Sequence, residues 1–369
     1  MRPSAFLLMD SRIDIIIRNL FLCKFRVDKR AIPTILLGVV FTLLLWPFQL
    51  AEFIYYKIKT RKTKVKPVFI VGHWRSGTTM LQYILAKDGN LSYFDTLSAY
   101  CVNTVVWKPL LRKVLPPILI RAFDNMEYNL VYPWEDSVCF TEYCSYSNWS
   151  RHMFPQDRER YLDYAVVDEL PTKIQAKWFR AYDNMIRKFY VQSGNGRPMV
   201  FKGPDATART LFLSKKYPDA VFLNVYRSPY AVIRSTINMY KFTTTYFSLQ
   251  ALPTEQEEEE FIIHQFKRIY TKYFEDIKSI PADRIIELRF EDLEKDPMPM
   301  LEEAYKRFGW DWESAKEPLR AYWDSLSGYQ KNVFDYSPRL IRRVNEELGF
   351  YFEHYGYEML PVPDAPFEQ

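Results

Sequence analysis

The residues best suited to chemistry in this chain stand in one short loop, GHWRSGTT at 72–79. The loop follows the apolar run VFIV at 68–71 and leads into a segment whose apolar residues have helical spacing from Thr78. In a strand–loop–helix unit of this kind, backbone N–H groups and the helix dipole favour an anion in the loop. Arg75 adds a planar, permanently charged group. We therefore expect this loop to hold a phosphate group.

The loop differs from the nucleotide-binding P-loop at one informative position. Both glycines and the final hydroxyl of G-x-x-x-x-G-K-[ST] are present, but Thr78 stands where the lysine belongs. That lysine reaches the outer phosphates of a nucleoside triphosphate and assists phosphoryl transfer. Its absence argues against a P-loop kinase or NTPase. That class is the main alternative, and a non-catalytic, membrane-bound nucleotide-binding protein is the second.

A second strand–turn–helix unit begins at AVFLNV, residues 220–225. Ser228 can cap the helix that follows, and Pro229 fits its first position. Arg227 then lies where a parallel strand ends, at the edge where open α/β sheets bind ligands. Read alone, an arginine at a strand end is more often part of a surface ion pair.

The two units resemble segments of a known family, the sulfotransferases that use 3′-phosphoadenosine-5′-phosphosulfate (PAPS). The segment FIVGHWRSGTT at 69–79 resembles the loop that binds the 5′-phosphosulfate, especially in bacterial members and in relatives of tyrosylprotein sulfotransferases. Trp74 stands where proline is common. The segment RSPYAVIRS at 227–235 looks like the 3′-phosphate motif, R-x-P-x-x-[VA]-x-x-S.

Two weaker motifs extend the resemblance to about residues 67–310. KGP at 202–204 is similar to a strand-end K-x-P motif, with Gly203 where relatives usually have serine. FEDLEKDP at 290–297 looks like a late segment of the family that shapes the back of the site. Read from the sequence alone, its two leading acids are helix caps rather than catalytic groups.

The resemblance implies that PAPS is the co-substrate, that no metal takes part, and that specific residues bind the donor. It places Arg75 and Lys202 as the catalytic cations, with Lys202 near the transferring sulfuryl group. Arg227 and Ser235 would bind the 3′-phosphate. The 5′ side would be bound by the loop residues Arg75, Ser76, Gly77, Thr78 and Thr79.

An acceptor hydroxyl group also needs a general base within hydrogen-bond reach. Relatives use glutamate or histidine, and three residues here are candidates: Glu135 in PWEDSV, Asp95 in YFDTL and His152 in YSNWSRHMF. The two acids rank ahead of the histidine. Each candidate has a structural alternative, because Glu135 can be a surface acid, Asp95 a helix cap and His152 a packed ring.

The strand–turn–helix units and the resemblance together imply an α/β, P-loop-like three-layer fold, with a central parallel sheet flanked by helices. We expect a membrane-anchoring segment and basic linker at 1–66 and a sulfotransferase domain at 67–369. The acidic run EQEEEE at 255–260 predicts a solvated helix start, and 338–358 predicts a closing amphipathic helix. The aromatic-rich region 96–190 is the expected place for acceptor recognition.

The N-terminal segment carries an uncharged apolar run at 31–48, the lower limit for crossing a hydrocarbon core of about 30 Å. Pro47 should kink or end this helix. Basic residues flank both sides, so the positive-inside rule gives no orientation. An anchor that dips into one leaflet, helped by the amphipathic stretch 13–22, fits this symmetry. A single span and a buried hairpin are the alternatives.

Composition limits the partners and the compartment. The net charge is +5, and no nucleic-acid-binding motif accompanies the basic cluster at 57–66, which predicts contact with membrane lipid rather than nucleic acid. Four cysteines without paired spacing suit a reducing compartment, and we expect the catalytic domain to face the cytoplasm. The expected acceptor is a small molecule or lipid with a free hydroxyl, first a sterol or lipid alcohol and second a glycan. The sequence predicts no oligomeric state.

Overall fold

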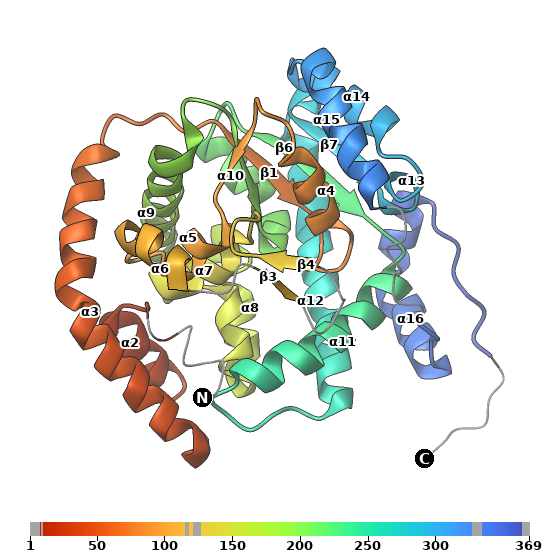
Figure 1. The fold of residues 1–369 in the computed structure, drawn as a ribbon. Coiled ribbons are helices and arrows are strands. Elements are labelled where there is room, and N and C mark those ends of the chain that lie inside the picture. The colour runs from red at the N-terminus through yellow and green to blue at the C-terminus, as the bar shows by residue number, and fades with distance from the viewer. Residues whose placement is uncertain (1–7, 9, 115–117, 121–126, 327–333, 364–369) are drawn as a thin grey trace.

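A parallel five-stranded sheet lies at the centre of the computed structural model, which describes residues 8, 10–114, 118–120, 127–326 and 334–363 (Figure 1). The strand order is β2-β5-β1-β6-β7. The bounds are β1 Pro67–Val71, β2 Ser92–Tyr93, β5 Met199–Lys202, β6 Val221–Tyr226 and β7 Ile285–Arg289. Every pairing in this sheet is parallel. Strands β1 and β6 match the strands expected at 68–71 and 220–225 to within one residue, and β5 ends at Lys202, as the strand-end motif implied.

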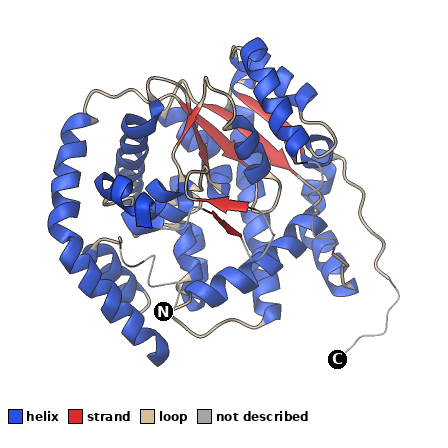
Figure 2. Ribbon diagram, in the orientation of Figure 1, coloured by secondary structure: helices blue, strands red, loops and turns tan. Residues whose placement is uncertain are grey.

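The central strands are apolar throughout because helices cover both faces of the sheet. Along β1, Phe69 and Val71 pack into one hydrophobic cluster, whereas Val68 and Ile70 pack into the other. The second cluster is closed by α4 (Thr78–Leu85), α13 (Phe290–Leu293), α14 (Met298–Phe308) and α15 (Trp312–Ser325). Figure 2 shows the strands between these helices and those on the opposite face. The three-layer α/β fold expected from the sequence is confirmed.

The larger hydrophobic cluster lies on the opposite face and is formed by helices from three regions of the chain. These are α7 (Asp136–Tyr143), α8 (Arg158–Asp163), α9 (Thr172–Phe189), α10 (Thr210–Lys216), α11 (Pro229–Phe247), α12 (Glu255–Asp276) and α16 (Pro338–Tyr355). Smaller elements lie between β2 and α7 in the chain, namely α5 (Thr96–Tyr100), α6 (Lys108–Val114) and an antiparallel pair, β3 (Ile118–Ile120) and β4 (Glu127–Asn129).

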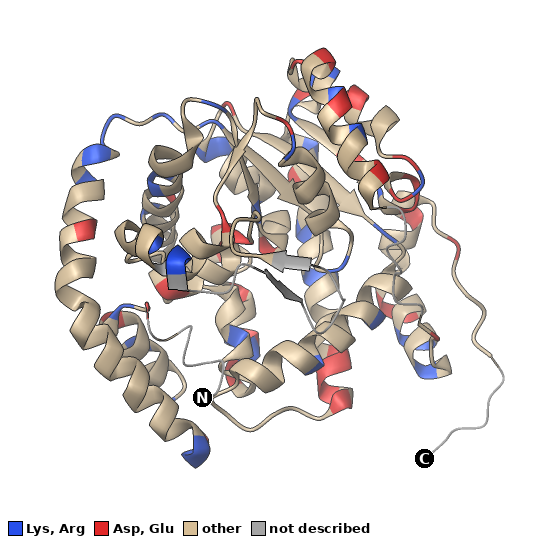
Figure 3. Ribbon diagram, in the orientation of Figure 1, with Lys and Arg blue, Asp and Glu red and all other residues tan. Residues whose placement is uncertain are grey.

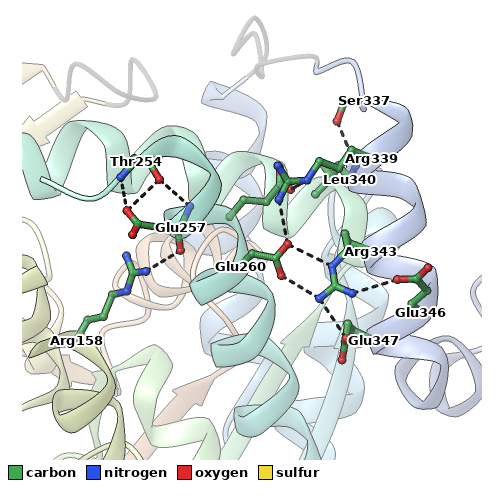
Figure 4. Close-up of polar contacts among 11 residues, drawn as sticks. Arg158, Thr254, Glu257, Glu260, Ser337, Arg339, Leu340, Arg343, Glu346 and Glu347 are labelled. Carbon is green, nitrogen blue, oxygen red and sulfur yellow. Dashed lines mark hydrogen bonds and ion pairs between the residues drawn. The ribbon is translucent and has the colours of Figure 1, made fainter. Parts of the chain in front are cut away.

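The acidic run begins α12, as the sequence predicts. Thr254 and Glu257 form a reciprocal capping box at its first turn. The run is less solvated than expected, because Glu260 forms ion pairs with Arg339 and Arg343 of α16 (Figure 4). These contacts join the closing helix to the rest of the fold.

The N-terminal segment forms two helices, α2 (Ile13–Leu22) and α3 (Ile32–Lys59), and α3 runs along one side of the molecule (Figure 1). The prediction that Pro47 would kink or end the helix is wrong in its second part, since α3 continues for twelve residues beyond it to Lys59. Pro47 and Leu43, the residue four positions before it, are both exposed, so the missing hydrogen bond lies on the outer face of the helix.

Candidate active site

The loop after β1 needs glycine at two positions. Gly72 has φ of +125°, and a Cβ there would lie 2.3 Å from the carbonyl oxygen of Val225. Gly77 has φ of +109°, and a Cβ would lie 2.3 Å from the Phe290 ring. Arg75 also has a positive φ, +69°, which is unusual for a residue with a side chain. Strain of this kind collects at functional sites, where the surrounding structure holds the backbone in place.

Buried polar groups fix the inside of the same loop. The Ser76 hydroxyl donates to the carbonyl oxygen of His73 at 2.8 Å, and the Gly72 N–H donates to the Thr207 hydroxyl at 2.7 Å. Burial lowers the pKa of His73 to about 3, so its ring is neutral at physiological pH. The side chain of Ser76, expected at the donor phosphate, therefore closes the turn. Thr78 is also buried, whereas Thr79 is partly exposed at the start of α4.

The two arginines expected at the phosphates lie together. The Arg75 Nε donates to the Ser235 hydroxyl at 3.0 Å, and Arg227 donates to the backbone carbonyl of Arg75 at 3.2 Å. Arg227 also stacks over the Phe290 ring, 4.2 Å from its centroid. Burial lowers the pKa of Arg227, and the Arg75 charge adds to this effect. Residues 75, 227 and 235 thus form one cationic cluster between two strand ends.

Lys202 lies at the same edge of the sheet, at the end of β5. It is paired opposite Ile70 of β1, and its ammonium group forms an ion pair with Glu135 at 2.8 Å. The Glu135 side chain is 13 % exposed and that of Lys202 is 6 % exposed. Burial opposes ionisation of Glu135, but Lys202 outweighs it, so the pKa of this carboxyl lies below its ordinary value. Glu135 is therefore ionised at neutral pH.

Trp74 connects the loop to this ion pair. Its indole N–H donates to Glu135 Oε1 at 3.2 Å, and the Arg151 guanidinium lies over the indole ring at 4.6 Å. The sequence marked Trp74 only as an unusual residue where proline is common. Its contact with a carboxylate 61 positions away could not be inferred from spacing along the chain.

A steric contact explains why residue 203 is glycine and not the serine usual in relatives. A Cβ on Gly203 would lie 2.2 Å from Oδ1 of Asp136, which is buried and accepts a hydrogen bond from the Tyr182 hydroxyl. Burial raises the pKa of Asp136 to about 6. The departure from the serine of relatives is thus coupled to Asp136, which the sequence places directly after Glu135 in PWEDSV but which was not ranked among the candidate bases.

The other two base candidates have structural contacts. Asp95 caps α5 by accepting the Ser98 N–H at 2.9 Å, and it pairs with Lys108 at 2.7 Å. Its backbone also bridges to Pro133, two residues before Glu135. His152 is buried, with Nδ1 3.0 Å from the Thr244 hydroxyl. Burial holds the pKa of His152 well below its ordinary value. Of the three candidates, the structure places Glu135 against Lys202.

The acids at 291 and 292 lie at the back of the cluster. Glu291 accepts the Ser228 N–H at 3.0 Å and the Tyr357 hydroxyl at 2.7 Å. It therefore fixes the first turn of α11 and does not cap the helix that follows residue 291 in the chain, as the sequence had predicted. Asp292 is half exposed and pairs with Lys295. Through Ser228, Glu291 fixes the backbone next to Arg227.

The donor set fits a ligand with two anionic groups. Two guanidinium groups, a hydroxyl and a glycine-bounded helix start can bind phosphates, and Lys202 offers a further charge at the neighbouring strand end. Within the described residues, no three His, Cys, Asp or Glu side chains gather as a metal site requires.

Comparisons with known proteins agree with this geometry. The sequence model described as "Sulfotransferase family" matches residues 67–314. The omega-hydroxy-beta-dihydromenaquinone-9 sulfotransferase Stf3 of Mycobacterium tuberculosis, with the same match in Mycobacterium bovis, is 28 % identical over 297 residues, covering 79 % of this chain and 75 % of Stf3.

Two crystal structures share the fold. Sulfotransferase STF9 from Mycobacterium avium has a TM-score of 0.67 at 15 % identity and covers 84 % of this chain and 82 % of its own. Sulfotransferase STF1 from Mycobacterium tuberculosis has a TM-score of 0.63 at 16 % identity, with 88 % and 87 % covered.

Proposed function

The chain belongs to the sulfotransferase family, and from this premise we propose that it moves the sulfuryl group of PAPS to the hydroxyl of a lipophilic acceptor. Sulfotransferase activity follows from the family. The alternative functions, a P-loop kinase or NTPase and a non-catalytic nucleotide-binding protein, are therefore excluded. The donor, the acceptor class and the residue roles are the parts that we propose.

The cationic cluster at the carboxyl edge of the sheet is the observation that carries the proposal. Arg75, Arg227 and Ser235 contact one another although they come from two separate strand–turn–helix units. A single nucleotide with phosphates at its 5′ and 3′ positions would engage both units, with the loop at 72–79 on its 5′ side. This arrangement supports PAPS as the donor, as does the family.

Transfer of a sulfuryl group is a displacement at sulfur, in which negative charge builds on the leaving phosphate and on the sulfuryl oxygens. Fixed cations stabilise such charge strongly in a site with little water. We assign Lys202 and Arg75 to this role. The positive φ of Arg75 and the ion pair of Lys202 hold both groups at the strand ends before any ligand arrives.

Glu135 is the general base in this proposal. The acceptor hydroxyl has a pKa far above 7, so it must lose its proton as the O–S bond forms, and an ionised carboxylate within reach can accept it. Lys202 and Trp74 hold Glu135 ionised and oriented. Asp95 supports the same region through its bridge to Pro133, and His152 packs behind it among aromatic rings.

Two observations support a lipid alcohol as the acceptor. The name of Stf3 gives omega-hydroxy-beta-dihydromenaquinone-9 as the molecule on which that relative acts. In this chain, exposed apolar residues at Val106 and Trp107 precede Lys108, which pairs with Asp95 near the proposed base. A glycan acceptor is the second candidate, and we keep it as an outcome of the test.

We further propose that residues 1–66 attach the enzyme to a membrane and that residues 67–369 form the catalytic domain, facing the cytoplasm. One helix, within Lys29–Lys59, is apolar and long enough to cross a bilayer, and only 28 % of its most apolar window is buried. A membrane-attached enzyme would meet a lipid acceptor in the layer where that acceptor is dissolved.

The proposal is tested by incubating the full chain with ³⁵S-labelled PAPS and separate pools of lipid alcohols, sterols and glycans. We expect label in the lipid pool, and label confined to glycans would overturn the acceptor class. Arg75→Ala and Arg227→Ala should abolish binding of adenosine 3′,5′-bisphosphate in calorimetry, whereas the surface variant Arg197→Ala should bind normally. Unchanged affinity in both site variants would overturn the assignment of the donor site.

A further inference from the structure

The polarity of α3 is reversed relative to a helix on the surface of a water-soluble domain. Its inward face is mostly polar, and its buried residues are Thr34, Ile35, Gly38, Thr42, Gln49 and Glu52. Its outward face is apolar, with the exposed residues Ile32, Leu36, Val40, Leu43, Leu44, Trp46, Phe48, Leu50, Phe53, Ile54 and Ile58. A large exposed apolar surface of this kind marks an interaction site.

The inward polar face is bonded first to the segment before α2 and then, through Glu52, to the globular domain. The Thr42 hydroxyl donates to the backbone carbonyl of Ser11, and Gln49 donates to that of Asp10. Glu52 accepts two backbone N–H groups, those of residues 105 and 106, at 3.0 Å each, and forms a buried ion pair with Lys188 of α9. These contacts hold α3 lengthwise against the domain.

Neighbouring elements extend the apolar face. Phe48 of α3 packs against Trp107 with ring centroids 5.3 Å apart, and Val106 and Leu110 are exposed beside it. The segment of α2 and the turn after it adds Ile17, Phe21 and Phe25. We call this set, the outward residues of α2 and α3 with residues 106, 107 and 110, the apolar face.

Basic residues stand at both ends of α3. Lys29 and Arg30 precede it, Lys57 and Lys59 lie in its last turn, and four more basic residues follow at 61–66. Figure 3 shows these cations at the two ends of the helix, with almost uncharged ribbon between them. A helix that lies in the plane of a bilayer places both of its ends at the headgroups, so this charge pattern fits such a helix better than it fits a span.

We infer that the apolar face lies in one leaflet of an anionic bilayer and that α3 runs parallel to the membrane surface without crossing it. The length of α3 does not distinguish an in-plane helix from a membrane-spanning one, since 28 residues reach about 42 Å and a span needs about 30 Å. The inward contacts do decide. The helix is held near both ends, because Ile35 packs in the main hydrophobic cluster and Glu52 is bonded to Lys188 and to two backbone donors. A span would have to break one of these two attachments, exposing either the apolar cluster or a charged side chain that is now paired.

A cleft of about 750 Å³ opens between α2, α3 and α9 and favours anionic lipid as the partner. Its walls combine the rings of Trp46, Phe53 and Tyr56 with the cations Arg12, Lys57 and Arg180. Arg12 pairs with Asp14 at the rim. A headgroup phosphate suits the cations, and the acyl chains would continue along the apolar residues of α3.

The first test measures binding of the full chain to sedimenting vesicles of phosphatidylcholine, alone or with phosphatidylglycerol. We expect binding that is stronger by about tenfold or more with the anionic lipid. The triple variant Leu36→Glu, Leu43→Glu, Leu44→Glu should lose about tenfold or more in binding, whereas Leu252→Glu, at an exposed residue outside the apolar face, should not. Equal binding of both variants, or no preference for the anionic vesicles, would overturn the inference.

The second test separates an in-plane helix from a span. Single cysteines are placed at Lys29 and Lys62, on either side of α3, and sealed membrane vesicles are labelled with an impermeant maleimide. The four native cysteines are buried, so the unmodified chain gives the background. We expect both positions to react from the same side. Labelling from opposite sides would establish a span. The inference does not rest on the acceptor, because the chain can bind membranes whatever it sulfates.

Discussion

At the scale of single residues, the site depends on a carboxylate held between a lysine and an indole. Glu135 forms an ion pair with Lys202 and accepts a hydrogen bond from Trp74. Lys202 ends β5, and Trp74 lies in the loop that follows β1. The motif residues that we propose to bind phosphates could be identified from the sequence because they lie next to one another in the chain. The partners of Glu135 could not, since they are 61 and 67 positions away.

The first prediction concerns the base. Glu135→Gln keeps the shape of the side chain and can still accept the indole hydrogen bond, but it cannot take up a proton. We expect kcat to fall by about 10²- to 10⁴-fold, with little change in the affinity for adenosine 3′,5′-bisphosphate. Steady-state kinetics and calorimetry check both parts. Glu313→Gln, at an exposed residue of α15, is the control, and a near-normal kcat in Glu135→Gln would rule out this role.

The second prediction concerns the contact between Gly203 and Asp136. Gly203→Ala would place a methyl group closer to the carboxyl oxygen of Asp136 than van der Waals contact allows. We expect a loss of about 1–3 kcal/mol in unfolding free energy. Denaturant unfolding measures this loss. Gly349→Ala is the matched control, because a Cβ there meets only the end of Met359 at 3.6 Å.

A double variant identifies the cause of that loss. In a chain that already carries Asp136→Ala, adding Gly203→Ala should cost much less, since the clashing oxygen is gone. Equal costs in the two backgrounds would show that the backbone at 203 and not the carboxyl group sets the requirement for glycine.

At the scale of elements, the clearest lesson is how α3 joins the domain. The sequence predicted an apolar helix at 31–48, but the helix extends to Lys59 because the polar residues Gln49 and Glu52 face inward, where Gln49 is bonded to Asp10 and Glu52 to the domain. Their partners lie in residues 10, 105, 106 and 188, so the apolar pattern alone could not place the end of the helix. The loop at 72–79 and its flanking strand and helix were predictable because their signals are local.

The third prediction uses a buried carboxyl group behind this helix. Both oxygens of Glu142 are buried, and neither has a hydrogen-bond partner among the residues that the structure describes. Burial first, then Asp10, raises its pKa well above 4.5. Because the folded state binds this proton more tightly than the unfolded state, the stability that it contributes is present below pH 4.5 and is lost as the pH rises above that value. Glu142→Gln should therefore make the unfolding free energy fall less between pH 4.5 and 8.

Denaturant unfolding at several pH values measures this slope. Burial also raises the pKa of Asp10 to about 7, so part of the slope should persist in Glu142→Gln. The exposed variant Glu255→Gln should keep the full slope. A slope in Glu142→Gln equal to that of the unmodified chain would mean that this carboxyl group is not protonated in the folded state.

At the scale of the whole molecule, residues 1–66 are tied to the catalytic domain more closely than a separate anchor would be. The predicted boundary at 66 and 67 falls just before β1, where the sheet begins. However, the buried ammonium group of Lys188 has its carboxylate partner, Glu52, in the N-terminal segment. The hydrophobic cluster on this side of the sheet also includes residues of α2 and α3.

The fourth prediction follows from this buried ion pair. A chain that begins at residue 67 should lose about 3–5 kcal/mol of stability, because Lys188 loses its carboxylate partner and the hydrophobic cluster loses residues of α2 and α3. Lys188→Met in the shortened chain should recover part of the loss, whereas the same substitution in the full chain should destabilise it by stranding Glu52. Thermal and denaturant unfolding distinguish these results, and a shortened chain as stable as the full one would contradict the prediction.

The contact between Gly203 and Asp136 also limits the order in which substitutions at these two positions can accumulate during evolution. Serine at 203 is unfavourable while the aspartate holds its present position, and it is accommodated more easily after a smaller side chain has replaced that aspartate. The two substitutions therefore have a preferred historical order, with position 136 first. In a laboratory lineage selected for sulfation, changes at 203 should arise only in descendants of changes at 136.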